Sequence, residues 1–116
     1  MPAIPDEAYR YLEDVIYLPM LTKVLEQDLE LIMKLPFKLN RPYIAIVEKA
    51  LHRVHADLKR ADIYLKRHNM KVIRESLTKE QSNYVFTHMG YEERKSYSNM
   101  LLRERSEELL GTYLSS

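Results

Sequence analysis

The stretch that decides the fold is Tyr43 to Lys66, YIAIVEKALHRVHADLKRADIYLK. Its apolar residues recur at alternating steps of three and four, which places them on one stripe of a helix, whereas a strand would need alternation in twos. The stripe consists of Ile44, Val47, Leu51, Val54, Leu58, Ala61 and Leu65. Because charged and polar side chains fill the other positions, the pattern predicts a helix that buries one narrow seam against a neighbouring helix.

The residues on either side of this stretch set the ends of the helix. Pro42 suits a first helical turn, where a missing N–H costs nothing, and Asn40 suits the N-cap. His68 and Asn69 form a C-terminal stop, so we expect the helix to end at Arg67. A helix of this length spans about 40 Å. Other elements must therefore pack along it, and its seam is completed either within the chain or by a second copy.

A second long helix is expected before this one, starting near Asp6, whose charge complements the helix dipole. Its inner stripe continues through Leu21, Leu25, Leu29, Ile32 and Leu35. Pro19 lacks an N–H for the carbonyl of Val15, so we expect a kink or a short break there. The connection LPFKLNRP, residues 35–42, is short, and the two helices should therefore lie antiparallel.

The chain changes character after Arg67. Residues 70–77 (MKVIRESL) and 84–89 (YVFTHM) are short, partly β-branched or aromatic, and separated by a polar run, which predicts a two-stranded hairpin. A lone hairpin is marginal in water, so we expect it to pack on the helices through Val72, Ile73, Tyr84 and Phe86. A closing helix is expected from about Ser98 to Leu114. The predicted fold is mainly α, an antiparallel helical bundle with a small β-hairpin before the C-terminal helix, in one domain over residues 1–116.

Composition narrows the possible functions. The chain has no cysteine, which excludes disulfides and thiolate chemistry, and only 2 glycines, too few for a glycine-rich phosphate loop. A net charge of +1 gives no overall field for nucleic acid. The N-terminal residues MPAIPDEAYRYLED lack the pattern of a secretory signal, and no apolar run is long enough for a membrane span. We therefore expect a cytoplasmic protein.

Catalytic patterns are weak. Glu48, His52 and His55 lie on one flank of the long helix with Asp62 further on, but their spacing differs from that of di-iron bundles and no second histidine-bearing helix completes a site. Asp28 lies in an apolar stripe and should meet a cation or hydroxyl, or reach solvent. We expect no catalytic residues, no metal, no cofactor and no small-molecule substrate. We therefore predict that the protein is not an enzyme.

Two sets of residues favour a binding function instead. Tyrosine is enriched at protein interfaces, although phenol rings also edge cores, and the candidates are Tyr9, Tyr11, Tyr17 and Tyr64. Basic residues gather where the long helix ends and the hairpin begins, although cations also favour the last turn of a helix. These are Lys59, Arg60, Lys66, Arg67, Lys71 and Arg74. We predict a protein–protein interaction or regulatory module that binds a partner or itself, with a nucleic-acid-binding regulator as the alternative.

Several strings of the sequence resemble a known family. They are LEDVIYLPMLTKVLEQD, LPFKLNRPYIAIVEKAL, DLKRADIYLKRHNMKV, GYEERKSY and RSEELLGTYL, which together cover most of the chain. These strings resemble the YhjD-like proteins, small uncharacterised helical proteins of bacilli with relatives in their phages. The resemblance implies a compact cytoplasmic protein from that source. It transfers no functional residue, because none of the strings is a catalytic or ligand motif.

Overall fold

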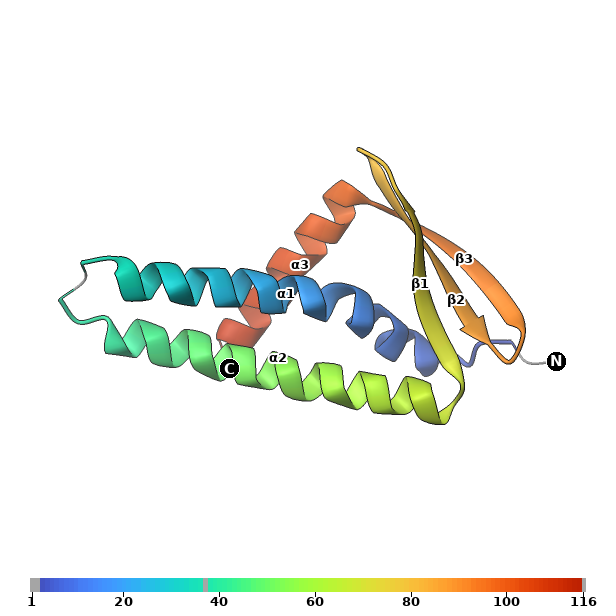
Figure 1. Ribbon diagram of the computed structural model, residues 1–116, viewed down its shortest axis with the longest axis horizontal. Helices are drawn as coiled ribbons and strands as arrows, with labels where there is room; N and C mark the ends of the chain where they lie inside the picture. The colour runs from blue at the N-terminus through green and yellow to red at the C-terminus, as the bar shows by residue number, and fades with distance from the viewer. Residues whose placement is uncertain (1–2, 37, 116) are drawn as a thin grey trace.

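The protein was analysed as a computed structural model, which describes residues 3–36 and 38–115. Two long helices run side by side in opposite directions, a sheet stands at one end of the pair, and the last helix crosses behind them (Figure 1). The elements in chain order are α1 (Ala8–Lys34), α2 (Arg41–Arg67), β1 (Met70–Leu77), β2 (Gln81–His88), β3 (Tyr91–Ser98) and α3 (Asn99–Leu114). None of the helices in the described residues has the length and apolarity needed to cross a membrane.

The long central helix has the predicted limits. Helix α2 follows Asn40 and ends at Arg67, with Pro42 in its first turn, although the Asn40 side chain makes no capping hydrogen bond. Helix α1 is continuous from Ala8 to Lys34, so of the kink or short break expected at Pro19, the break is wrong. Pro19 itself is exposed, whereas Leu18 and Leu21 are buried. The packing of these two leucines holds the helix together across the proline. Phe37, in the connection between the helices, lies outside the described residues.

The predicted fold class is wrong, because the protein is an α+β structure with a three-stranded antiparallel sheet rather than a helical bundle with a hairpin. The strand order is β1-β2-β3, and β3 is the strand that sequence reasoning missed. Its sequence YEERKSYS hides the alternation of a half-buried strand, since the positions that share a face with Tyr97 include Glu93 and Lys95. Tyr9 of α1 contacts both residues. The Lys95 ammonium group lies over the Tyr9 ring, and the Tyr9 hydroxyl donates a hydrogen bond to Glu93.

Tight turns and a bulge shape the sheet. Strands β2 and β3 are joined through Met89 and Gly90, both with positive φ (+50° and +85°), which is the pattern of a type I′ turn. The pairing of β1 with β2 is regular from Met70 to Arg74 and then shifts, leaving Glu75 as a bulge. Asn99, at the start of α3, donates its side-chain amide to the Thr78 and Lys79 carbonyls and so holds the loop between β1 and β2.

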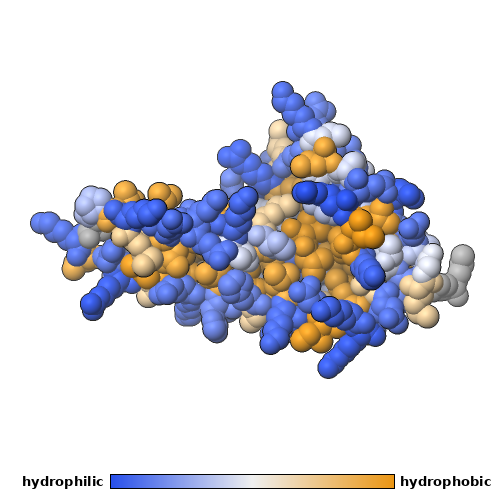
Figure 2. Space-filling model, viewed as in Figure 1, coloured by the Kyte–Doolittle hydropathy of each residue, from blue (hydrophilic) through white to orange (hydrophobic). Residues whose placement is uncertain are grey.

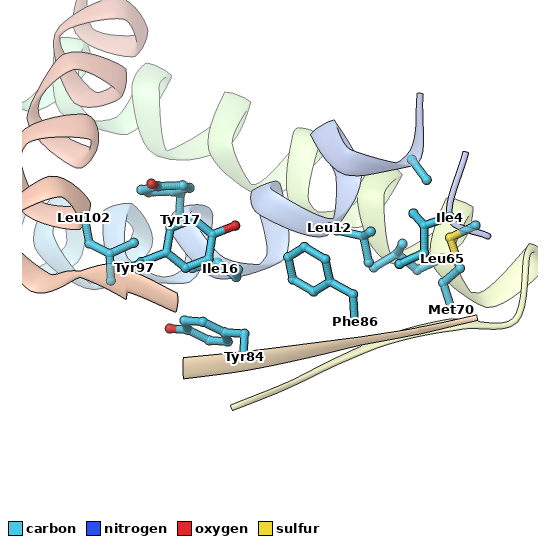
Figure 3. Packing of buried hydrophobic residues seen from close by; sticks show 11 residues of the cluster. Ile4, Leu12, Ile16, Tyr17, Leu65, Met70, Tyr84, Phe86, Tyr97 and Leu102 are labelled. Carbon is cyan, nitrogen blue, oxygen red and sulfur yellow. The ribbon is translucent and has the colours of Figure 1, made fainter. Parts of the chain in front are cut away.

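The core consists of two clusters of buried side chains. In the larger cluster, Phe86 of β2 is fully buried and points at Leu12 of α1, while Tyr84, Tyr17 and Tyr97 gather nearer α3 (Figure 3). The smaller cluster joins α1 and α2 with the second half of α3. It consists of Leu18, Leu21, Leu25, Val47, Ala50 and Val54. Of the four residues expected to pack the hairpin on the helices, Tyr84 and Phe86 are buried, Val72 is half-buried, and Ile73 is exposed.

Candidate interaction groove

A groove of about 1060 Å³ lies between α1 and the sheet, on the side of the sheet where β1 forms the edge. Apolar side chains gather in the middle of this face, between α1 and β1, with hydrophilic side chains around them (Figure 2). The α1 wall is formed by one stripe of the helix: Val15, Ile16, Pro19 and Met20. The end of α2 contributes Leu65 with Asp62 and Lys66, and the sheet contributes the remaining wall.

The edge of β1 faces the groove. Six consecutive residues, Asn69 to Arg74, line it, although successive side chains of a strand point to opposite faces of a sheet. Consecutive lining residues therefore mean that the strand presents its edge. Strand β1 pairs with β2 alone, and among the described residues no backbone group outside the sheet bonds to Lys71–Leu77. Its outward N–H and C=O groups are thus available to another strand.

Charge around the groove is mainly positive. Its lining contains the three cations Lys66, Lys71 and Arg74, against a single acid, Asp62. All four residues are exposed at the rim, whereas Leu65, Met70 and Tyr84 beneath them are buried. The groove therefore combines an apolar floor, an open strand edge and a basic rim, an arrangement that suits an extended segment carrying apolar and acidic side chains.

The basic residues singled out in the sequence do not form one patch. Lys66, Lys71 and Arg74 line the groove. Arg60 instead pairs with Asp57 at 2.8 Å and lines a second hollow together with α3. Lys59 and Arg67 are exposed and line neither hollow. Half of the set is thus brought together, and it borders apolar residues that the sequence did not connect with it.

The four candidate interface tyrosines lie largely inside the fold. Tyr17 is buried, while the other three are half-buried. Tyr11 and Tyr64 stack with their ring centres 4.1 Å apart, and Tyr64 stacks in turn on His68. Tyr9 contacts Phe86. These rings hold the start of α1 against the end of α2 and the sheet, and none of them lines the groove.

Tyrosine hydroxyls also tie the elements together through carboxylates. Tyr97 donates to Glu13 Oε2 at 2.9 Å, and burial followed by this hydrogen bond raises the pKa of the Tyr97 phenol. The hydrogen bond from Tyr9 to Glu93, followed by burial, raises the pKa of Tyr9 to about 12. Such phenols stay neutral donors near pH 7 and serve as structural ties between α1 and β3.

The acidic and imidazole residues singled out in the sequence lie apart from the groove, except Asp62. Glu48, His52 and His55 are exposed on α2, and no three His, Cys, Asp or Glu side chains in the described chain could hold a metal ion together. Asp28 lies at solvent on α1. Burial raises the pKa of Asp14, and the positive charge of Arg10 acts in the opposite direction. These acids do not converge in a cavity.

Sequence reasoning missed most of the groove residues. Met89 and Ile73 line it and are 66% and 52% exposed, a high fraction for large apolar side chains. Two features of the sequence could have indicated the groove: an apolar residue in a tight turn, Met89, and the basic residues Lys71 and Arg74 in the first strand. They indicate a groove only when α1 is known to lie opposite β1.

Comparison with known proteins places the chain in a family. The family model described as YhjD protein matches residues 3–116. The chain belongs to the YhjD family. It is 30% identical over 114 residues to the uncharacterized protein YhjD of Bacillus subtilis (strain 168), covering 98% of this chain and 95% of that protein. No solved structure matches it significantly.

Membership of the YhjD family confirms the resemblance and the link to bacilli. The relationship with phage proteins stays a prediction. The relative is uncharacterized, so it assigns no residue of this YhjD-family chain a role, and the function of the groove must be inferred from its own geometry.

Proposed function

We propose that this YhjD-family protein is a non-enzymatic interaction or regulatory module that binds an extended segment of a partner protein along the edge of β1. The observation that carries the proposal is the run of six consecutive lining residues, Asn69 to Arg74, at an unpaired strand edge. An added strand gains main-chain hydrogen bonds from such an edge and specificity from pockets for alternate side chains. We place this activity in the cytoplasm, in keeping with a chain that has no cysteine.

The chemistry of the groove defines the partner segment. Acidic side chains of the partner segment would meet Lys66, Lys71 and Arg74, while its apolar side chains would cover Val72 and Met20. The regular edge extends from Met70 to the bulge after Arg74, which limits the added strand to about five residues. A short, charge-assisted contact of this kind gives weak and reversible binding, as a regulatory module requires.

A synthetic peptide tests this proposal. The probe is a labelled, end-capped eight-residue peptide in which glutamate alternates with valine, and its counterpart carries lysine in place of glutamate. We expect only the glutamate peptide to raise the fluorescence anisotropy, with binding that weakens as salt rises. Protection of the Met70–Arg74 amides from hydrogen exchange should accompany binding, because the added strand covers that edge.

Matched variants locate the site. Replacing Lys71 and Arg74 together by glutamate should weaken binding about tenfold or more, a loss of roughly 1.4 kcal/mol. Lys79→Glu reverses a charge in the loop between β1 and β2, outside the groove lining, and should leave binding unchanged. Equal binding of both peptides, or no binding at 1 mM, would refute the proposal. Tighter binding of single-stranded DNA, lost in the same double variant, would assign the groove to nucleic acid instead.

A further inference from the structure

The register of the sheet determines which backbone groups of β2 point toward β1. Strands β2 and β3 are joined by a two-residue turn, 89–90, which is flanked by the pair His88 and Tyr91. In such a hairpin the flanking pair exchanges backbone hydrogen bonds, and bonded pairs then alternate along the strands. His88 therefore bonds toward β3, whereas Thr87 and Val85 direct their N–H and C=O groups toward β1.

The same alternation continues into β1. Lys71 and Ile73 lie directly opposite those two residues of β2, so their N–H and C=O groups bond within the sheet. The backbone groups of Met70, Val72 and Arg74 consequently point outward at the edge. In the described residues no backbone hydrogen bond from outside the sheet reaches these three. A strand added to this edge must therefore pair with them.

The two cations of β1 lie on opposite faces of the sheet. Successive side chains of a strand alternate between faces, so Arg74 shares with Val72 the face that packs on α1. Lys71 shares the outer face with Ile73. Lys71 and Arg74 are three residues, about 10 Å, apart along the strand. A ligand that binds both cations must carry its acids on both faces.

Neither cation is neutralised by the chain itself. Within the described residues Lys71 and Arg74 make no ion pair. Glu75, which follows Arg74 in the bulge, pairs instead with Arg94, with 3.4 Å between Oε2 and Nε. Asp62 is the single acid in the groove lining. Both cations are thus available to acidic side chains of a partner.

One apolar side chain lies on each face between the two cations. Val72 faces α1 and is half-buried, whereas Ile73 faces outward and is 52% exposed. A residue of an added strand lies on the same face as the β1 residue opposite it, with the two Cβ atoms about 5 Å apart. The edge from Lys71 to Arg74 therefore presents the order cation, apolar, apolar, cation.

We propose that the partner segment carries the motif acidic, apolar, apolar, acidic, and that this motif pairs with residues 71–74. The inference rests on the strand addition proposed above. Acids three residues apart fall on opposite faces of an extended segment, so each meets one of the two cations. The two apolar residues between them cover Val72 and Ile73. Because the motif is the same in both directions, it fits an added strand of either orientation.

The occupant of the edge is a different protein rather than this chain. In this sequence the only two acids three residues apart are Glu104 and Glu107, and they enclose Arg105 and Ser106 instead of apolar residues. A second copy of β1 would bring the cations of two edges together, and like charges on paired strands destabilise the pairing.

Two labelled, end-capped peptides of identical composition test the motif. Ser-Thr-Glu-Val-Val-Glu-Thr-Ser has its glutamates three residues apart, and Ser-Thr-Glu-Val-Glu-Val-Thr-Ser has them two apart. Fluorescence anisotropy should show about fivefold tighter binding of the first, because glutamates two apart lie on one face and reach only one cation. Equal binding, or tighter binding of the second peptide, would overturn the motif and leave strand addition intact. If neither these peptides nor the alternating glutamate–valine peptide binds, strand addition fails and the motif with it.

Double-mutant cycles identify the paired charges. Lys71→Gln and Arg74→Gln should each weaken binding of the motif peptide about threefold, and each should couple to a different glutamate when that glutamate is replaced by glutamine. Lys79→Gln, in the loop outside the groove, is the control and should couple to neither. The three lysine and arginine positions are exposed, and circular dichroism verifies that each variant is folded. Coupling of both cations to the same glutamate, or to none, would overturn the pairing.

Amide exchange followed by NMR tests the backbone register. In the free protein the amides of Lys71 and Ile73 should exchange slowly, since they bond to β2, while those of Val72 and Arg74 exchange fast. Saturation with the motif peptide should slow Val72 and Arg74 several-fold and leave the other two unchanged. Protection of the opposite set, or of none, would overturn this register.

Discussion

At the scale of single residues, two buried hydroxyl groups of this fold are each paired with a polar side chain of another element. Tyr97, 7% exposed, meets Glu13, and its ring lies edge-on to Tyr17 and Tyr84. Ser82 is buried and donates to Asn99 Oδ1 at 2.7 Å. Each pair joins elements far apart in the chain. The two hydroxyls therefore help to specify how α1, the sheet and α3 sit together, whereas the buried Thr22 Oγ1 has no hydrogen-bond partner among the described residues.

Tyr97→Phe should destabilise the protein by about 1 kcal/mol at pH 7, because Glu13 loses a donor. The pKa of Tyr97 is raised above 10 in the folded state, so its contribution is complete below pH 10 and is lost as pH rises above that value. The difference in unfolding free energy between the parent and Tyr97→Phe should therefore shrink from pH 9 to pH 11. Urea unfolding at several pH values measures this difference.

A second variant separates the hydrogen bond from the charge of its acceptor. Glu13→Gln keeps an oxygen that can accept from Tyr97, so we expect a smaller loss of stability than in Tyr97→Phe. A Tyr97→Phe protein as stable as the parent would mean that this hydroxyl contributes nothing to the fold. A difference that stays constant with pH would mean that folding does not raise the pKa of Tyr97.

At the scale of elements, α2, α3 and β1 follow their local sequence, while β3 and the continuity of α1 across Pro19 do not. Pro19 favours a kink or a short break, yet α1 continues through it because Leu18 and Leu21 are almost fully buried on the opposite side. Strand β3 contains four charged residues and is held by pairing with β2 and by Tyr9. Neighbours in space override local propensity at both places.

Pro19→Ala should stabilise the protein by about 1–3 kcal/mol, because alanine restores a donor for the Val15 carbonyl and removes the ring from the middle of the helix. Denaturation with urea measures the change as a higher midpoint at an unchanged slope. Pro42→Ala is the matched control. Pro42 lies in the first turn of α2, where the missing N–H costs nothing, so the change there should stay within about 0.5 kcal/mol. Destabilisation by Pro19→Ala would show that the proline conformation is part of the packing.

At the scale of the whole molecule, stability is distributed unevenly along the helical pair. The half beside the sheet shares a core with three strands and α3, whereas the other half has a single seam between two helices. The groove lies at the end with the larger core. It therefore rests on the part of the helical pair that should be locally more stable.

Hydrogen exchange measured by mass spectrometry should reveal this gradient. At a few micromolar, amides of residues 28–34 and 43–48 should exchange faster than those of residues 12–22 and 54–65, because fewer buried contacts oppose their opening. Uniform protection along both helices at low concentration would contradict the uneven core.

Local apolar periodicity and turn residues were enough to predict the two long helices, the limits of α2, the position of β1 and the place of the last helix. The basic residues near the end of α2 were also visible. The α+β class, the third strand, and the position of Lys66, Lys71 and Arg74 beside an apolar groove were apparent only in the folded chain. Strand pairing and the contact of α1 with β1 depend on residues far apart in the chain, and local spacing does not encode such contacts.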